Sequence, residues 1–133
     1  MSVYEMFKTN PSLEKEGITL DYGSFSIRIA RAGGHNSAFL KAMERESKPF
    51  RRAIQQETIS ADIAEEILRK VYADTVVLGW EGITDEDGNV LQFSKENCVK
   101  LFRDLPDLFN EIKETANKMA VYREVAKEEE SKN

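Results

Sequence analysis

The strongest constraint on the fold is a long amphipathic pattern in the middle of the chain. Apolar residues recur at steps of three and four from Ile63 to Val76, the spacing that places side chains on one face of an α-helix. Ser60 precedes them, and its hydroxyl can cap the first turn. More apolar residues follow as far as Trp80, so the sequence predicts a core helix that ends at Trp80 with protein packed around its last turn.

A second pattern, with period two, precedes this helix. Apolar residues alternate with polar ones on both sides of Gly23, which predicts a β-hairpin with one buried and one solvated face. The alternating apolar residues are Ile18, Leu20, Tyr22, Phe25, Ile27 and Ile29. Val90–Phe93 is predicted to form a short strand that could join the hairpin as a third strand.

Three more helical stretches follow from capping and proline signals. Asn36 or Ser37 can cap a helix that Pro49 kinks before it ends near Gln56. Two later helices are expected to begin at Ser94 and at Pro106, the last of them with apolar positions as far as Val125. The predicted fold is therefore α+β and predominantly α-helical, with four to five helices and a small antiparallel hairpin.

The chain of 133 residues has the size and composition of one domain. It is 41% hydrophobic and 32% charged, which suits a packed core. Residues 1–16 carry little pattern, and residues 127–133 form a polar tail expected to fray. A lone thiol at Cys98 and the lack of a leader-like or membrane-spanning apolar run predict a cytoplasmic protein.

Catalytic and cofactor signals are weak. His35 is the only histidine, Cys98 has no second cysteine, and Gly33-Gly34 lacks the rest of a phosphate-binding loop. Asp85–Asn89 superficially resembles a calcium loop, but Val90 stands where that loop requires glycine. We therefore expect no enzyme activity, no metal and no cofactor, and we expect the acidic segment to form a hairpin-like turn.

Charge is unevenly distributed along the chain. Residues 28–52 hold seven basic and two acidic side chains, a local charge of +5 in a chain of net charge −5. This basic run is compatible with an ordinary surface, with a dock for an acidic protein or, less favourably, with nucleic-acid binding. Its charge is opposite to that of Glu81–Asp87, and we hypothesise head-to-tail self-association between the two regions.

The segment Tyr72-Ala73-Asp74-Thr75-Val76-Val77-Leu78-Gly79-Trp80-Glu81-Gly82-Ile83, followed by Asp85 and Gly88, resembles the tail assembly chaperones of lambda-like siphophages. Three further features occur in the order typical of that family. They are Gly33 to Asn36 after the Arg-x-Ala-Arg strand, Phe93-Ser94, and Leu105-Pro106-Asp107-Leu108-Phe109. The resemblance covers roughly residues 18–122.

The resemblance implies a protein of the host cytoplasm that is absent from the finished virion. Such a chaperone keeps the tape measure protein soluble and helps tail tube subunits to polymerise around it. The family also commonly makes a longer product by ribosomal frameshifting, and this chain would correspond to the short form. A head-tail or tail-completion protein that stays in the virion is the alternative, and an enzyme or nucleic-acid regulator is a weaker one.

A chaperone needs a groove that covers apolar client surface reversibly. The apolar residues near the end of the predicted central helix are candidates for that contact, although the favoured interpretation is that they fill the core of this domain. The candidate protein-binding residues are Tyr72, Val77, Trp80, Glu81, Asp85, Asp87, Arg28, Arg31, Arg45, Arg51 and Arg52.

Overall fold

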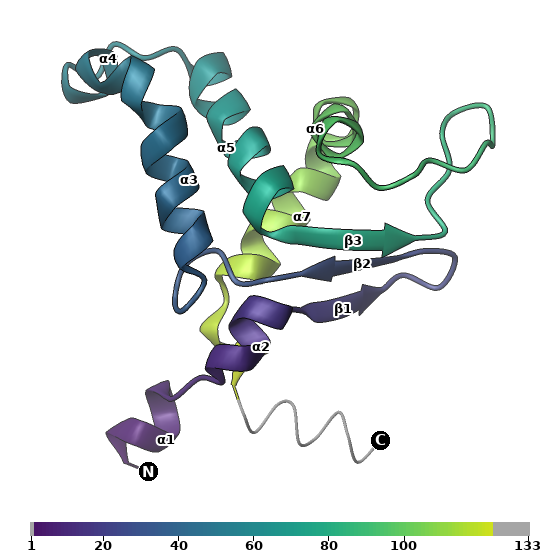
Figure 1. Ribbon diagram of the computed structural model, residues 1–133, viewed down its shortest axis with the longest axis horizontal. Coiled ribbons are helices and arrows are strands. Elements are labelled where there is room, and N and C mark those ends of the chain that lie inside the picture. The colour runs from purple at the N-terminus through teal and green to yellow at the C-terminus, as the bar shows by residue number, and fades with distance from the viewer. Residues whose placement is uncertain (1, 124–133) are drawn as a thin grey trace.

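The computed structural model describes residues 2–123 and shows helices packed against a small antiparallel sheet (Figure 1). Its elements are α1 (Val3–Phe7), α2 (Pro11–Glu16), β1 (Ile18–Asp21), β2 (Ser26–Ile29), α3 (Ser37–Ser47), the 3-10 helix η1 (Lys48–Phe50), α4 (Arg51–Gln55), α5 (Ala61–Thr75), β3 (Val77–Glu81), α6 (Lys95–Asp104), α7 (Pro106–Asn117) and the 3-10 helix η2 (Met119–Tyr122). The predicted α+β, predominantly helical fold is confirmed.

The sheet has the strand order β1-β2-β3, with both pairs antiparallel. The predicted hairpin is confirmed, since Ile18 pairs with Ile29 and Leu20 with Ile27. The inward residues Ile18, Ile27 and Ile29 are buried, whereas Thr19 on the opposite face is exposed. One face of the sheet therefore carries the core and the other meets solvent, as the period-two pattern requires.

The prediction that the central helix runs to Trp80 is wrong, because α5 ends at Thr75 and β3 follows at once. In the pairing with β2, Ile27 lies opposite Trp80 and Ile29 opposite Val77, and the register shifts between Arg28 and Ile29. This bulge gives β3 one extra residue, so two core-facing side chains stand three positions apart instead of two. Spacing by three is also a helical spacing, which explains the error.

The expected strand at Val90–Phe93 is also wrong, since these residues form no strand. Val90 makes only an isolated bridge with Thr84. The place beside the hairpin is taken by β3, whose backbone pairs with β2 immediately after α5 ends. Tertiary pairing thus overrides a local β preference.

The helix starts largely match the capping signals. Ser60 Oγ accepts a hydrogen bond from the Ile63 N–H at the start of α5, and Ser94 Oγ accepts one from Asn97 N–H at the start of α6. The predicted kink at Pro49 is confirmed, because η1 separates α3 from α4. Asn36 precedes α3, but its side chain makes no capping bond there.

The last predicted helix is shorter than expected. α7 ends at Asn117, and Lys118 is extended, with φ −80° and ψ 112°. The break lets η2 return to the core, where Tyr122 is fully buried and its carbonyl accepts a hydrogen bond from Asn10 N–H at 2.9 Å. Val125 and the predicted polar tail lie outside the described residues.

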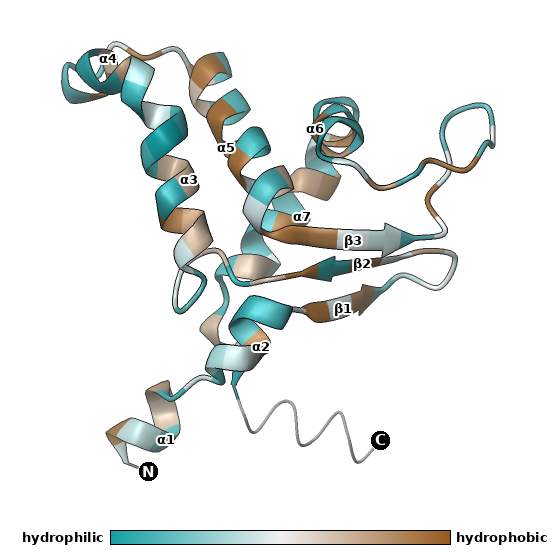
Figure 2. Ribbon diagram, viewed as in Figure 1, coloured by the Kyte–Doolittle hydropathy of each residue, from teal (hydrophilic) through white to brown (hydrophobic). Residues whose placement is uncertain are grey.

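The main core fills the space between the sheet and the helices. Aromatic rings of α5, α6 and α7 stack or meet edge to face, with Phe102 and Phe109 centroids 4.5 Å apart and Tyr72 and Phe109 centroids 5.6 Å apart. A second cluster of Ala42, Ile67 and their neighbours joins α3 to α5. Figure 2 shows the corresponding alternation of hydrophobic and hydrophilic turns along α5.

A buried carboxylate fastens the N-terminal segment to this body. Glu14 is fully buried, and its carboxylate accepts hydrogen bonds from Thr9 Oγ1 and from the His35 N–H at 2.7 Å. The His35 ring Nδ1 lies 3.0 Å from Oε1, and Arg31 Nη1 lies 3.4 Å from Oε2. Burial opposes ionisation, but these hydrogen bonds and the Arg31 charge outweigh it and lower the pKa of Glu14 from 4.5 to about 2.

The loop between β2 and α3 is shaped around this carboxylate. Gly34 has φ +55°, and a Cβ at this position would collide with the Glu14 carboxylate, so the loop requires glycine here. Two residues later, Asn36 Nδ2 donates to the carbonyls of Arg31 at 2.8 Å and Thr75 at 3.0 Å. The Gly-Gly-x-Asn motif therefore links α2, the β2–α3 loop and the end of α5.

Replacing Glu14 with Gln should lower the free energy of unfolding at neutral pH by about 2 kcal/mol, because hydrogen bonds to a charged group are lost. The folded-state pKa lies below the unfolded one, so the wild-type contribution is complete above about pH 4.5 and disappears as the pH falls towards 2. Urea unfolding across this range should show that dependence in the wild type and much less of it in E14Q. Glu16→Gln, an exposed change in the same helix, is the control. Equal stabilities of E14Q and E16Q would contradict the role assigned to Glu14.

Candidate protein-binding site

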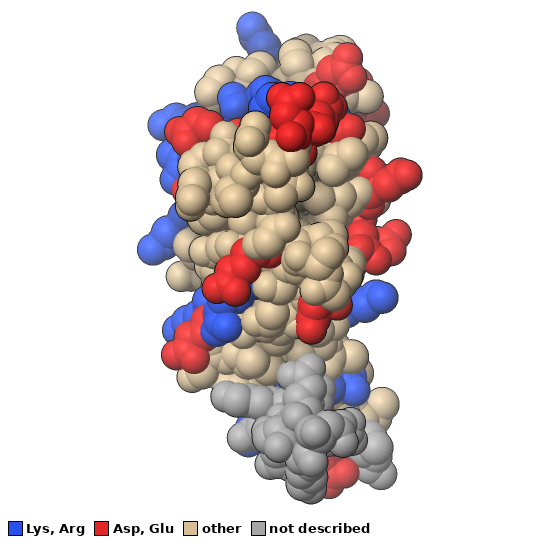
Figure 3. Space-filling model, turned by 90° about the vertical axis from the view of Figure 1, so that its right-hand side faces the viewer, with Lys and Arg blue, Asp and Glu red and all other residues tan. Residues whose placement is uncertain are grey.

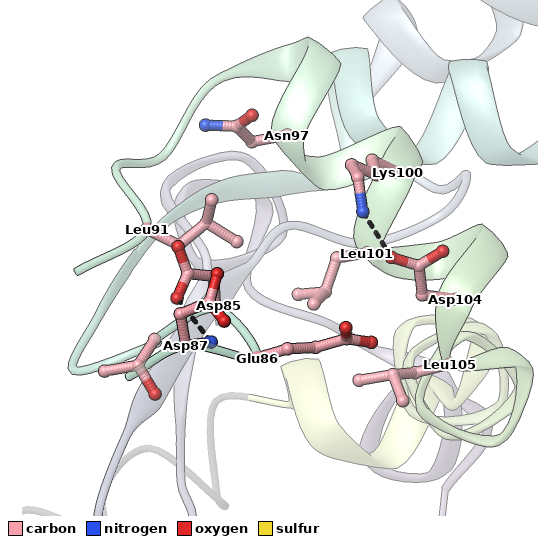
Figure 4. A pocket seen from close by; sticks show the side chains of 10 residues that line it. Asp85, Glu86, Asp87, Leu91, Asn97, Lys100, Leu101, Asp104 and Leu105 are labelled. Atoms are coloured by element: carbon pink, nitrogen blue, oxygen red, sulfur yellow. Dashed lines mark hydrogen bonds and ion pairs between the residues drawn. The ribbon is translucent and has the colours of Figure 1, made fainter. Parts of the chain in front are cut away.

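A groove with an apolar floor and an acidic rim lies between the β3–α6 connection and the helices that follow it (Figure 4). We call it the acidic groove; its volume is about 520 Å³. Its lining residues are Thr84, Asp85, Glu86, Asp87, Leu91, Asn97, Lys100, Leu101, Asp104 and Leu105. Leu91, Leu101 and Leu105 supply the apolar floor, and Leu105 remains 49% exposed.

The rim of the acidic groove carries excess negative charge. Lys100 Nζ lies 2.6 Å from Asp104 Oδ2, so the one basic residue of the groove is already paired. Asp85, Glu86 and Asp87 make no ion pair with any residue from 2 to 123. The groove is therefore suited to an apolar side chain flanked by cations.

The acidic loop is a hairpin-like turn built by Asp85, which confirms the turn predicted there. Its Oδ1 accepts hydrogen bonds from the N–H groups of Asp87 at 3.0 Å and Asn89 at 2.9 Å, and its own N–H donates to the Asn89 carbonyl. Gly88 adopts φ +82° to close the turn. Asp85 is thus committed to the loop structure, whereas the side chains of Glu86 and Asp87 make no hydrogen bond within residues 2–123.

Trp80 anchors this loop to the sheet. Its indole Nε1–H donates to the Leu91 carbonyl at 2.8 Å, and its ring meets Phe93 edge to face with centroids 5.0 Å apart. The Leu91 N–H donates to the Ile83 carbonyl at 2.9 Å. Trp80 therefore holds the acidic loop in place without itself lining the acidic groove.

Two other candidates at this end of the molecule are core residues. Tyr72 and Val77 are each only 3% exposed, and the Tyr72 hydroxyl accepts a hydrogen bond from Asn117 Nδ2 at 2.9 Å. They cannot contact a partner in this fold, which corrects their place among the candidate binding residues and agrees with the core interpretation. Glu81 is exposed at the end of β3, opposite Ser26.

The structure divides the basic run of the sequence into separate groups. Arg31 contacts the buried Glu14, Arg45 pairs with Asp74 at 2.8 Å, and Arg28 Nε donates to the Glu16 carbonyl at 2.6 Å. These three arginines serve intramolecular contacts and do not form one binding surface.

Of the remaining cations, Lys41 is exposed within α3, and the other three lie just after α3 and in α4. We call the exposed residues Lys48, Arg51, Arg52 and Ile54 the basic tip. The three cations make no ion pair within the described chain, and Ile54 is 42% exposed. Lys48, Arg51 and Ile54 border a shallow depression of about 300 Å³, with Glu44 on the same rim.

The acidic groove and the basic tip lie at opposite sides of the molecule. In Figure 1, α4 is at the upper left and the loop after β3 at the upper right, with α5 and α6 between them. Figure 3 faces the side of the acidic loop and shows both acidic and basic side chains around a largely uncharged area. The carboxylates of the acidic loop and the cations of the basic tip, unpaired within residues 2–123, therefore face away from each other.

The only histidine and the only cysteine of the chain, His35 and Cys98, both have structural surroundings. The His35 ring is tied to Glu14, and burial raises the pKa of the Cys98 thiol to about 12, which keeps it protonated at neutral pH. Residues 2–123 contain no cluster of three or more side chains able to hold a metal ion. Within the same residues, no helix is long and apolar enough to cross a membrane.

The sequence analysis missed an exposed apolar arm at the N-terminus. We use this name for α1, whose large side chains Val3, Tyr4, Met6 and Phe7 are 68%, 78%, 43% and 59% exposed. In Figure 1 the helix lies apart from the rest of the protein. The signal was four apolar residues within five positions, interrupted only by Glu5.

The match to a family model identifies the class of protein. A model described as YdaY prophage protein matches residues 34–133, which include the acidic groove and the basic tip. The chain is thus a prophage protein, and specifically it belongs to the YdaY prophage protein family. No curated protein matches it, and no solved structure does. The phage origin implied by the sequence resemblance is confirmed, and the role in tail assembly stays a prediction.

Replacing Trp80 with Phe should loosen the rim of the acidic groove, because the ring contact with Phe93 is retained while the hydrogen bond to Leu91 is lost. We expect a loss of about 1 kcal/mol in stability and faster amide hydrogen exchange from residue 83 to 91. Exchange in the β1–β2 hairpin serves as the internal control. Unchanged exchange across residues 83–91 would show that the indole does not hold the loop.

Proposed function

We propose that this protein is a non-catalytic phage tail assembly chaperone. In this role it binds the tape measure protein in the host cytoplasm and helps to recruit tail tube subunits. Membership of a prophage family places the protein in a phage context, and the resemblance around Tyr72–Ile83 supports the finer assignment.

The observation that carries the proposal is the apolar arm. Contiguous exposed apolar surface on a protein of this size marks a contact with another protein or a membrane. The arm presents two aromatic rings, Tyr4 and Phe7, which together can bury a large area against a partner. A client with exposed apolar helix faces is the kind of partner such an arm can cover.

The rest of the protein suits a reversible binder. The arm is joined to the body by the segment at Asn10, whose N–H bonds to the Tyr122 carbonyl, so its side chains can rearrange without disturbing the core. Charged rims such as that of the acidic groove add orientation and speed of association more than affinity. This combination favours a chaperone that later releases its client to the tail tube subunits.

Co-expression with the tape measure protein of the same prophage tests the proposal. Wild-type chain should increase the soluble fraction of the tape measure protein, and the double variant Y4S/F7S should lose most of this effect. Burial of two aromatic side chains contributes about 3 kcal/mol, so affinity should fall roughly a hundredfold. Leu40→Ser, which removes another exposed apolar side chain from α3, is the matched control.

Two results would count against these statements in different ways. A tape measure protein that stays insoluble with the wild-type chain contradicts the chaperone function itself. Solubility that Y4S/F7S and L40S preserve equally leaves the function standing and excludes the arm as the client contact.

The composition of purified phage particles separates a chaperone from a structural tail component. A chaperone should be absent from virions by mass spectrometry while being present in the lysate that produced them. Stoichiometric recovery in the particle would instead identify a head-tail or tail-completion protein. Immunoprecipitation from the same lysate should recover the tape measure protein, the tail tube protein and the longer frameshifted form.

A further inference from the structure

We propose that copies of this protein associate head to tail, with the basic tip of one copy seated in the acidic groove of the next. This inference is independent of the proposed chaperone function, because it rests on two surfaces of the same chain. Both surfaces lie within residues 34–133, the part of the chain that matches the prophage family.

The two surfaces are complementary in charge. The basic tip offers Lys48, Arg51 and Arg52, which make no ion pair in residues 2–123, and the acidic groove offers Glu86 and Asp87, which make none either. Docking would bring each set against opposite charges instead of leaving both in solvent. Three other residues of the basic run already make contacts within the monomer. Arg31 and Arg45 form ion pairs, and Arg28 donates a hydrogen bond to the Glu16 carbonyl.

The two surfaces also match in their apolar parts. Ile54 lies on α4 beside Lys48 and Arg51 and is 42% exposed, while Leu91, Leu101 and Leu105 line the acidic groove. Figure 4 shows Leu91 beside the acidic loop, Leu101 in the centre of the groove and Leu105 on its far side, below Asp104. An isoleucine entering this floor would bury apolar surface on both sides and leave the cations at the acidic rim.

The positions of the two surfaces determine the symmetry of the assembly. Because they lie on opposite sides of one copy, the tip cannot fill its own groove (Figure 1). A contact between two different faces leaves one groove and one tip unfilled in every dimer. Growth therefore continues into a chain or closes into a ring.

The contact should be weak and sensitive to salt. A groove of about 520 Å³ receives only a few side chains. A standard stable interface is larger and buries roughly 800 Å² on each partner. Association should therefore depend on concentration, and ionic screening should weaken it, since the Debye length falls to about 3 Å at 1 M salt.

Sedimentation velocity on charge-reversal variants of the full chain tests the proposal. R51E/R52E reverses the charge of the basic tip, and E86K/D87K reverses the charge of the rim of the acidic groove. Glu86 and Asp87 are chosen because their side chains make no hydrogen bond within residues 2–123, whereas Asp85 builds the turn. Lys15→Glu with Lys118→Glu reverses the same amount of charge at exposed sites away from both surfaces and is the control.

The wild type and the control should show the same concentration-dependent association at low salt. Each interface variant alone should weaken it more than tenfold, because like charges would then face each other. An equimolar mixture of the two variants should regain association, because the intact tip of E86K/D87K fits the intact groove of R51E/R52E and the two reversed faces again carry opposite charges. The combined variant R51E/R52E/E86K/D87K should regain association through reversed charges.

Three results would overturn the proposal. They are a wild type that is monomeric at every accessible concentration in low salt, interface variants that associate as the wild type does, or a mixture of the two variants that stays monomeric. If a basic client segment, added as a peptide, binds the groove while the wild type stays monomeric, the groove belongs to a client and self-association is refuted.

Discussion

The carboxylate of Glu14 is buried completely, and the groups that bond to it come from the segment before α2 and from the loop after β2. Removing a charge from water is costly unless it is paired and hydrogen-bonded, so these segments hold one another in place. Asn36 extends the network to the carbonyl of Thr75, where α5 ends and β3 begins. This polar centre therefore joins the segment before α2, the loop that leads into α3 and the end of α5.

This centre gives a structural meaning to one motif of the sequence. Gly34 leaves room for the carboxylate, and Asn36 bridges two backbone carbonyls that are far apart in sequence. The same motif superficially resembles a phosphate-binding loop, but the anion that it binds is the protein's own side chain. Motif residues outside any active site can therefore carry a strict geometric requirement.

The features that could be predicted from the sequence are those encoded locally. Ser60 and Ser94 cap their helices, Pro49 interrupts a helix, and the alternation on both sides of Gly23 gives the hairpin. The third strand could not be recognised, because a bulge gave its core-facing residues a helical spacing. Glu14 could not be identified either, since its burial results from partners up to 21 positions away along the chain.

The candidate site was predicted only in part for a related reason. Local charge counts identified the acidic loop and the basic run. They did not show which of these charges form ion pairs within the folded chain. Pairing with Glu14 and Asp74 uses Arg31 and Arg45, whereas the cations of the basic tip make no ion pair in residues 2–123. The leucines of the groove floor come from the loop and from both sides of the α6–α7 junction, and no single segment of the sequence shows them together.

The construction of the acidic loop has a consequence for how such a protein can evolve. Asp85 closes the turn through bonds to its own neighbours, and Trp80 fixes the end of the loop to the sheet. The side chains of Glu86 and Asp87 are therefore uncoupled from folding. One or two substitutions there could change which partner is accepted at no cost to the core, so that related prophage proteins in one cell could keep separate partners.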